Sequence, residues 1–308
     1  MDTIGSRMRA ISRDLAGGFD GVPTPPALAW ALAADRHADA GTSEVVDLGD
    51  PRGRLVILAG PHALPYRDAL HAVAAHLDAP VANTWGAKGI FPWDSPHHMG
   101  TCGLQADDFE LLGFADYDVI LAVGIDPAES PRDRFALAPV VEIRPQTLTH
   151  LAEDVPARSH PIEPNALYER LAAVAQPGYV DDRTPRHPAR AVMDLKRNLA
   201  VREVVTAQPG PVGLWVARTF PTDGPGTVFV PAVDAPGIAA ACAVLAAAGG
   251  MPAVTVAPAP VDEITTSLLD AAARRSLPVR LEVWDETVDL SLTSLLVDAA
   301  GPVVAWTA

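Results

Sequence analysis

Cysteine is scarce in this chain of 308 residues. Cys102 and Cys242 are the only two, which is too few for a disulfide framework or a cysteine zinc cluster, so we expect two free thiols in a reducing compartment. The N-terminus also lacks the apolar core that a signal peptide needs. Both absences predict a cytoplasmic protein.

Basic residues are few, and they form no run. The 23 lysines and arginines face 38 acidic residues, which gives a formal net charge of −15 and disfavours nucleic acid as a partner. Residues 238–261 carry no charge over a length that could cross a membrane, but Gly249, Gly250 and Pro252 interrupt them. We predict a buried helix, a turn and a buried strand there, and no membrane partner.

The common catalytic motifs are missing too. No GxSxG sequence is present, so a serine nucleophile on a strand–helix turn is not indicated. His97, His98 and Cys102 lie close in sequence, but adjacent residues rarely ligate one ion well and no third ligand has a matching spacing. The sequence therefore favours neither a metal site nor a cysteine nucleophile. Asp107 and Asp108 are expected to begin a helix, where carboxylates complement the helix dipole.

Short apolar runs alternate with segments of helical spacing along the chain. Strands are predicted over 53–60, 80–85, 118–124 and 140–145, and later over 226–232, 252–258, 277–284 and 301–308. Helices are predicted over 65–79, 107–117, 164–175, 235–248 and 262–275, with one more beginning at Pro26. This alternation predicts an α/β fold with two doubly wound parallel sheets, each covered on both faces.

The composition divides the chain into four parts. We expect a lead segment over 1–47, a first α/β domain over 48–175, a polar linker with one helix over 176–210, and a second α/β domain over 211–308.

One loop stands out, residues 82–103 ("ANTWGAKGIFPWDSPHHMGTCG"), which has neither a helical nor a strand period. It leaves the carboxyl end of a predicted strand, the edge at which doubly wound sheets bind ligands. Loop amides and one lysine at this edge suit an anionic group, unless the glycines only make tight turns. The residues expected to line a cofactor site are Gly60, Thr84, Gly86, Lys88, Gly89 and Gly124.

Residues 53–175, and above all "GAKGIFPWDSPHHMG" and "DYDVILAVG", resemble the central domain of thiamine-diphosphate enzymes of the acetolactate synthase group. That family has a "GKGxFPxxHP" loop and an "aDlvlavG" strand, and some members bind FAD or a nucleotide at this edge. FAD-binding members usually present an aspartate about where this chain has Arg144. The reversed charge disfavours FAD and favours an anionic nucleotide or an empty cleft.

The second domain resembles a diphosphate-binding domain that has lost its motif. In the family, "GDG" and "NN" hold Mg²⁺ and the diphosphate of the cofactor. Aligning "LPV" places Pro258, Ala259 and Pro260 at "GDG", and Asp285 with Glu286 at "NN". A second register, to the pyrimidine-binding domain, places Ala235 at the catalytic glutamate. Thiamine diphosphate and Mg²⁺ are thus implied by the family, yet their ligands are absent in either register.

The resemblance implies a truncated acetolactate synthase-like protein without a preceding pyrimidine domain. We expect it to be non-catalytic alone, and to be an accessory or partner-dependent subunit that forms a homo-oligomer or assembles with a separate pyrimidine-domain protein. One alternative is a 2-oxoacid decarboxylase or carboligase completed by such a partner. Another is a nucleotide-binding module in the central-like domain. No catalytic residue is identified.

Overall fold

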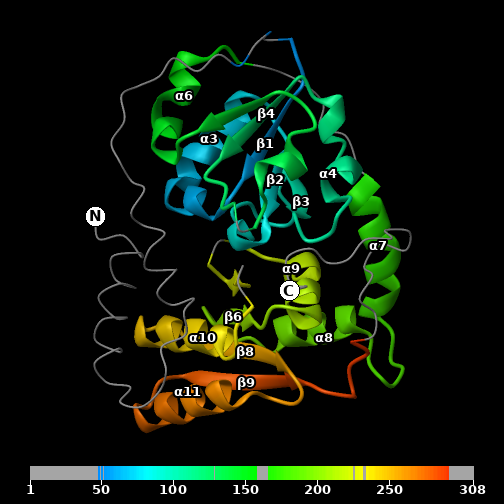
Figure 1. Cartoon of the computed structure of the whole chain (residues 1–308), viewed down its shortest axis with the longest axis vertical. Helices are drawn as coiled ribbons and strands as arrows, with labels where there is room; N and C mark the ends of the chain where they lie inside the picture. The colour runs from blue at the N-terminus through cyan, green and yellow to red at the C-terminus, as the bar shows by residue number, and fades with distance from the viewer. Residues whose placement is uncertain are drawn as a thin grey trace. The chain divides into compact units, whose positions relative to one another are not determined.

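The computed structural model describes residues 48, 50, 52–127, 129–157, 166–224, 226–231 and 234–290. They form two compact units, each built around its own parallel sheet (Figure 1). The first unit contains the described parts of 42–178 and the segment 217–226. The second contains 179–216 and the described parts of 227–292.

The first sheet has five parallel strands in the order β3-β2-β1-β4-β5. The strands are β1 (Leu55–Ala59), β2 (Val81–Thr84), β3 (His98–Cys102), β4 (Val119–Val123) and β5 (Val140–Ile143). The strand order reverses beside β1, which makes the sheet doubly wound and places its ligand-binding edge at the carboxyl ends of the strands. The predicted α/β class is confirmed.

Helices cover both faces of the first sheet. Figure 1 shows α3 (Arg67–His76) and α6 (Leu148–Asp154) on one side, with α4 (Asp108–Leu111) and α7 (Ala166–Tyr179) on the other. Each side has its own apolar core, because the β1 and β4 residues point alternately to the two faces. Short turns connect these elements: η2 (Pro61–Tyr66), η3 (Trp85–Ala87), η4 (Phe114–Asp116), α5 (Arg132–Phe135) and η5 (Pro145–Thr147).

The second sheet has four parallel strands in the order β7-β6-β8-β9. They are β6 (Val204–Ala207), β7 (Val228–Phe229), β8 (Ala253–Pro258) and β9 (Val279–Trp284). Its helices are α8 (Pro188–Arg197), α9 (Pro211–Thr219), α10 (Ile238–Ala248) and α11 (Glu263–Arg274). The alanine-rich α10 is buried over most of its length, since small side chains let it pack closely on β6, β8 and α11.

Four expectations differ from the structure or fall outside it. The stretch 82–103 is not all loop, because His98–Cys102 form β3 beside β2, and a register shift at Val81 and Ala82 hides the pairing from a simple pattern. The stretch 176–210 contains the expected helix, α8, and also β6. The helix from Pro26 and the strand over 301–308 lie outside the described residues. In the part of the chain that is described, no helix is both long and apolar enough to cross a membrane.

Candidate functional site

Two of the expected site glycines lie against each other at the centre of the first sheet. Gly60 follows β1 and Gly124 follows β4, its neighbour in the sheet. The N–H of Gly60 donates to the oxygen of Val123 at 2.9 Å, and a Cβ on Gly60 would lie 2.3 Å from the oxygen of Gly124. These glycines therefore let two loops meet closely, and the amide of Gly60 is already engaged.

The other expected residues fall at two places along the same edge. Thr84 ends β2, and Gly86, Lys88 and Gly89 follow in and after η3. Arg144 follows β5, which β1 and β4 separate from β2 in the sheet. Three strand spacings amount to about 14 Å. The sheet thus brings the β2 residues together and places Arg144 apart from them.

A buried carboxyl group lies under the η3 turn. Glu129, in the loop after β4, is only 4% exposed and accepts the N–H of Gly86 at 3.2 Å. A Cβ on Gly86 would be 1.9 Å from Oε1 of Glu129, so only glycine fits above this carboxyl. Burial is the main cause that raises the pKa of Glu129 to about 8, and Asp126 adds to it, while Thr84 and the Gly86 amide oppose it. Glu129 is therefore protonated at neutral pH.

Sequence reasoning missed Glu129, although "GIDPAES" directly follows the β4 strand and so lies at the ligand-binding edge. Its position in the chain was the one available signal. Glu129 and Gly86 are 43 residues apart, so no local sequence pattern predicts their contact.

Lys88 is the most unusual residue at this edge, because its side chain is buried. The residue is 6% exposed, and burial followed by the charge of Arg218 lowers the pKa of its amino group to about 7. His98, at the start of β3, is affected as well: burial and the charge of Lys88 lower its pKa to about 4. The lysine therefore titrates near neutral pH, and the imidazole of His98, which lies at the amino end of β3 opposite Val81, is neutral there.

An ion pair anchors the segment 217–226 to this edge. Nη2 of Arg218 lies 2.7 Å from Oδ1 and 2.8 Å from Oδ2 of Asp108, and both side chains are buried. Nη1 of Arg218 also donates to the carbonyl oxygen of Thr101. Oδ2 of Asp108 also accepts hydrogen bonds from the backbone N–H groups of Leu104 and Gln105, so the buried carboxylate has backbone donors as well as the arginine.

Asp108 begins α4 as the sequence predicted. Its pairing with Arg218 was not predicted, since the two residues are 110 positions apart.

The histidines and the cysteine of the loop do not assemble into a metal site. In the described ranges, no three His, Cys, Asp or Glu side chains are grouped so that they could hold an ion. Nδ1 of His97 contacts the oxygen of Ala79 at 3.0 Å. Burial, with Asp108 next in effect, raises the pKa of the Cys102 thiol well above its ordinary value, which disfavours the reactive thiolate.

The second unit places the two degenerate motif positions at neighbouring strand ends. Pro258 ends β8 and pairs with Trp284, which ends β9 and precedes Asp285. This is where "GDG" and "NN" would lie in the aligned register. However, the N–H of Ala259 donates to the oxygen of Trp284 at 3.0 Å, and the flanking prolines have no N–H.

Two of the acidic side chains near this turn make hydrogen bonds within the protein. Asp262 caps α11, accepting the N–H and the hydroxyl of Thr265 at 2.8 and 2.7 Å. Oδ1 of Asp285 accepts the N–H and hydroxyl of Thr287 at 2.9 and 2.7 Å. Ala235, the position of the second register, offers no carboxylate. The turn over 258–260 therefore offers neither a side-chain oxygen for Mg²⁺ nor a free N–H for a diphosphate, which need such groups.

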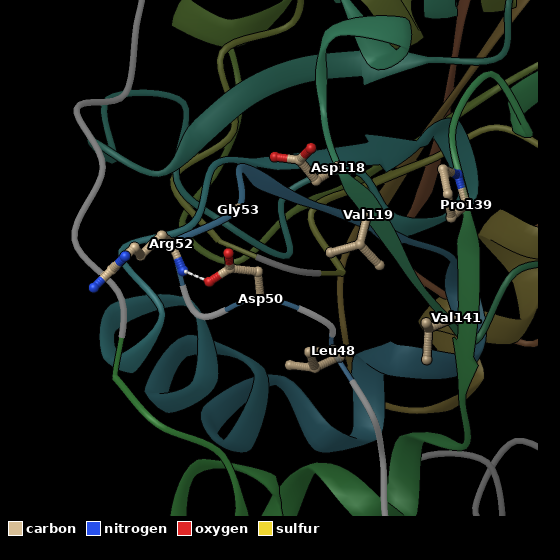
Figure 2. A pocket seen from close by; sticks show the side chains of 8 residues that line it. All are labelled: Leu48, Asp50, Arg52, Gly53, Asp118, Val119, Pro139 and Val141. Carbon is tan, nitrogen blue, oxygen red and sulfur yellow. Dashed lines mark hydrogen bonds between the residues drawn. The ribbon is translucent and has the colours of Figure 1, made fainter.

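A pocket of about 610 Å³ opens at the opposite edge of the first sheet (Figure 2). Leu48, Val119 and Val141 give it an apolar part, beside Asp50 and Asp118. Oδ1 of Asp50 accepts the N–H of Arg52, and Oδ2 of Asp118 accepts that of Arg54. The pocket thus lies at the amino ends of the strands, away from every residue expected to form a site.

The geometry of the first unit agrees with a comparison of the chain with known families. Residues 49–157 match the family model described as "Thiamine pyrophosphate enzyme, central domain". Residues 49–157 are therefore a domain of this kind, and the resemblance noted in the sequence is confirmed.

Two relatives extend the comparison. Over 128 residues, the chain is 31% identical to the probable 2-ketoarginine decarboxylase AruI of Pseudomonas aeruginosa, an alignment that covers 39% of this chain and 22% of the relative. A solved structure assigned as a thiamin diphosphate-dependent enzyme from Mycobacterium smegmatis aligns with a TM-score of 0.55 at 18% identity, covering 76% of this chain and 50% of that one. The chain thus spans about half of the solved structure and about a fifth of AruI. At this identity the structural match shows the fold alone.

Proposed function

We propose that this chain is an accessory or partner-dependent subunit of the thiamine-diphosphate enzyme family that does not hold the cofactor by itself. The observation that carries the proposal is the turn after β8, where Pro258, Ala259 and Pro260 occupy the aligned "GDG" positions. A metal-bound diphosphate requires a carboxylate and closely approaching amides at this point. Here the side chain is a methyl group and the one N–H is bonded to Trp284.

The nearby carboxylates support the same proposal. Both oxygens of Asp262 accept hydrogen bonds from Thr265, and Oδ1 of Asp285 accepts two from Thr287. Recruiting Asp262 to a metal ion would break the cap of α11. The second unit is better suited to a structural role than to holding the cofactor.

A second candidate is a 2-oxoacid decarboxylase or carboligase that a pyrimidine-domain partner completes. The 31% identity to a probable 2-ketoarginine decarboxylase favours it, although that alignment covers 22% of the relative. In this case the partner would supply the cofactor site and this chain would supply part of the assembly.

Reconstitution separates the two candidates. The chain is mixed with thiamine diphosphate, Mg²⁺ and 2-oxoacids, including 2-ketoarginine, alone and with a recombinant pyrimidine-domain protein, and CO₂ release is followed. We expect no release from the chain alone. Release from the mixture supports the second candidate, and a complex without turnover supports the first. Release from the chain alone contradicts both.

A further inference from the structure

The strand β9 forms an open edge of the second sheet (Figure 1). It lies at the end of the strand order β7-β6-β8-β9 and pairs with β8 on one side. In the described part of the chain, no strand pairs with its other side. β9 has six residues, whereas the edge strands β3, β5 and β7 have five, four and two. The open strand is thus the longest edge strand among the described residues.

Every second residue of β9 directs its backbone groups away from β8. In a strand, the N–H and C=O of one residue point to one neighbouring strand, and those of the next residue point to the opposite side. The oxygen of Trp284 accepts the N–H of Ala259, just after β8, at 3.0 Å. Trp284 therefore faces β8, and by this alternation the N–H and C=O groups of Leu281 and Val283 point to the open side.

Two apolar side chains of this edge are exposed. Leu281 is 36% and Val283 is 39% exposed, and both lie on one face of β9 because they are two residues apart. Val279 lies on that face too and packs against the buried cluster of α10 and α11. Edge strands are commonly protected by lysine, proline or a bulge, and β9 contains none of these. The edge is therefore able to pair with another strand.

The opposite face of β9 carries one positive and one negative side chain. Nη1 of Arg280 lies 3.6 Å from Oε2 of Glu282, and the two side chains are 39% and 28% exposed. Nε of Arg280 also lies 2.8 Å from Oε1 of Glu203. Oε1 of Glu282 accepts the indole N–H of Trp284 at 3.1 Å. Both charges are thus held in place on this face and remain accessible to a partner.

The sequence of β9 is complementary to itself in the antiparallel direction. A two-fold axis at Leu281 places this residue opposite its own copy. The same axis places Val279 opposite Val283, and Arg280 opposite Glu282. Apolar residues therefore face apolar residues, and each charge faces the opposite charge.

We propose that β9 binds the β9 of a second copy of this chain, antiparallel and about a two-fold axis at Leu281. The outward N–H and C=O groups of Leu281 in the two copies then bond to each other. The N–H of Val283 in one copy donates to the oxygen of Val279 in the other. The N–H of Val279 already donates to the oxygen of Leu277 at 2.9 Å, so each outer pair adds one hydrogen bond. The two sheets become one continuous sheet.

The side chains fit the same register. Arg280 of one copy faces Glu282 of the other in the pairs that exchange no backbone hydrogen bonds, where facing side chains are closest. Opposite charges at directly facing positions stabilise an antiparallel sheet. On the other face, Leu281 and Val283 pack against the apolar side chains of the second copy, which removes their surface from water.

The charges also select this register over its neighbours. A two-fold interface uses the same surface twice, so the surface must complement itself. An axis at residue 280 would place Arg280 opposite its own copy, and an axis at residue 282 would do the same with Glu282. Like charges at facing positions are destabilising. This inference does not depend on the proposed function, because it concerns the edge of β9 and not a cofactor site.

Sedimentation of the full chain over a range of concentrations tests the interface. We expect the wild type to form a dimer that Leu281→Lys weakens, because the substitution places two ammonium groups together at the axis. The dissociation constant of the dimer should rise about tenfold or more. Val201→Lys is the control, since Val201 is an 89% exposed valine of the same unit outside β9. This variant should dimerise like the wild type.

Cysteine cross-linking tests the register. In a hydrogen-bonded antiparallel pair the Cα atoms lie about 5.5 Å apart, which a disulfide can span. Mild oxidation should therefore link Leu281→Cys into a dimer but not Val201→Cys, with the wild type as the background of the two native thiols. Val279→Cys and Val283→Cys should link to each other in a mixture and not each to itself, because the like positions are about 14 Å apart along the strands.

A wild type that stays monomeric at high concentration overturns the proposal and leaves the edge to another occupant. A Leu281→Lys chain that dimerises as tightly as the wild type also overturns it. If Leu281→Lys does not fold, the cross-linking decides. Equal linking of Leu281→Cys and Val201→Cys, or faster linking of Val283→Cys to itself than to Val279→Cys, is incompatible with the pairing.

Discussion

Arg218 and Asp108 form a fully buried ion pair, with Nη2 of the arginine 2.7 and 2.8 Å from the two carboxylate oxygens. Their side chains are 1% and 0% exposed. The pair fixes the segment 217–226 on the first unit, where this segment lies against Gly89 and Trp93. It links the segment 217–226 to the start of α4, and both belong to the first unit.

Breaking this pair should be strongly destabilising. Arg218→Met leaves Asp108 without its charged partner, and we expect the free energy of unfolding to fall by about 3–5 kcal/mol. Chemical denaturation with urea measures it. Arg190→Met is the control, because Arg190 forms a more exposed ion pair with Asp194 on α8 and should cost about 1 kcal/mol or less. Equal losses in the two variants would contradict a special role for the buried pair.

Gly86 should not tolerate a side chain. In Gly86→Ala the new Cβ meets Oε1 of Glu129, so the loop or the carboxyl must move, at a cost of about 1–3 kcal/mol. Gly224→Ala is the matched control, since its Cβ would have no atom within 4 Å. Replacing Glu129 with alanine as well should restore part of the loss. Urea denaturation of the three variants tests this, and a Gly86→Ala protein as stable as Gly224→Ala would refute the contact.

Glu129 should make the protein less stable as the pH rises. Its folded pKa of about 8 lies above the ordinary 4.5, so its contribution is fully present below pH 4.5 and is lost as the pH rises through 8. The full difference corresponds to roughly 4–5 kcal/mol. Glu129→Gln should remove this dependence, so the variant should gain stability relative to wild type between pH 5 and pH 8. A constant difference between the two proteins across that range would show that the carboxyl does not titrate as described.

Both thiols should be unreactive in the folded protein. Burial raises the pKa of Cys242 to about 12 and that of Cys102 well above its ordinary value, so little thiolate forms at pH 8. We expect Ellman's reagent to label neither thiol in buffer and both in 6 M guanidinium chloride. Rapid labelling of Cys102 in buffer would reopen the nucleophile hypothesis, and Cys102→Ser would identify it.

The sequence predicted the sheet better than it predicted the site. The apolar runs of β1 and β4 are buried on both faces, so their residues are uniformly apolar and easily recognised. β3 was missed because "HMGTC" has no such pattern, and its position depends on pairing with β2.

The residues expected around Lys88 were found from their place after a strand. Their partners were not predicted, because they are distant in the sequence. Glu129 is 43 residues from Gly86, and Arg218 is 110 residues from Asp108. Such contacts depend on the tertiary fold, and a local pattern does not encode them. The segment 217–226 lies against Gly89, the residue after Lys88, and its place on this edge has no sequence signal either.

The most direct test of the central claim is titration calorimetry of the purified chain with thiamine diphosphate and Mg²⁺. The account predicts no binding tighter than about 1 mM, because the turn at Pro258, Ala259 and Pro260 offers neither a metal ligand nor a free amide. A thiamine-diphosphate enzyme with an intact "GDG" motif is the positive control. Micromolar or tighter binding to this chain alone would contradict the account.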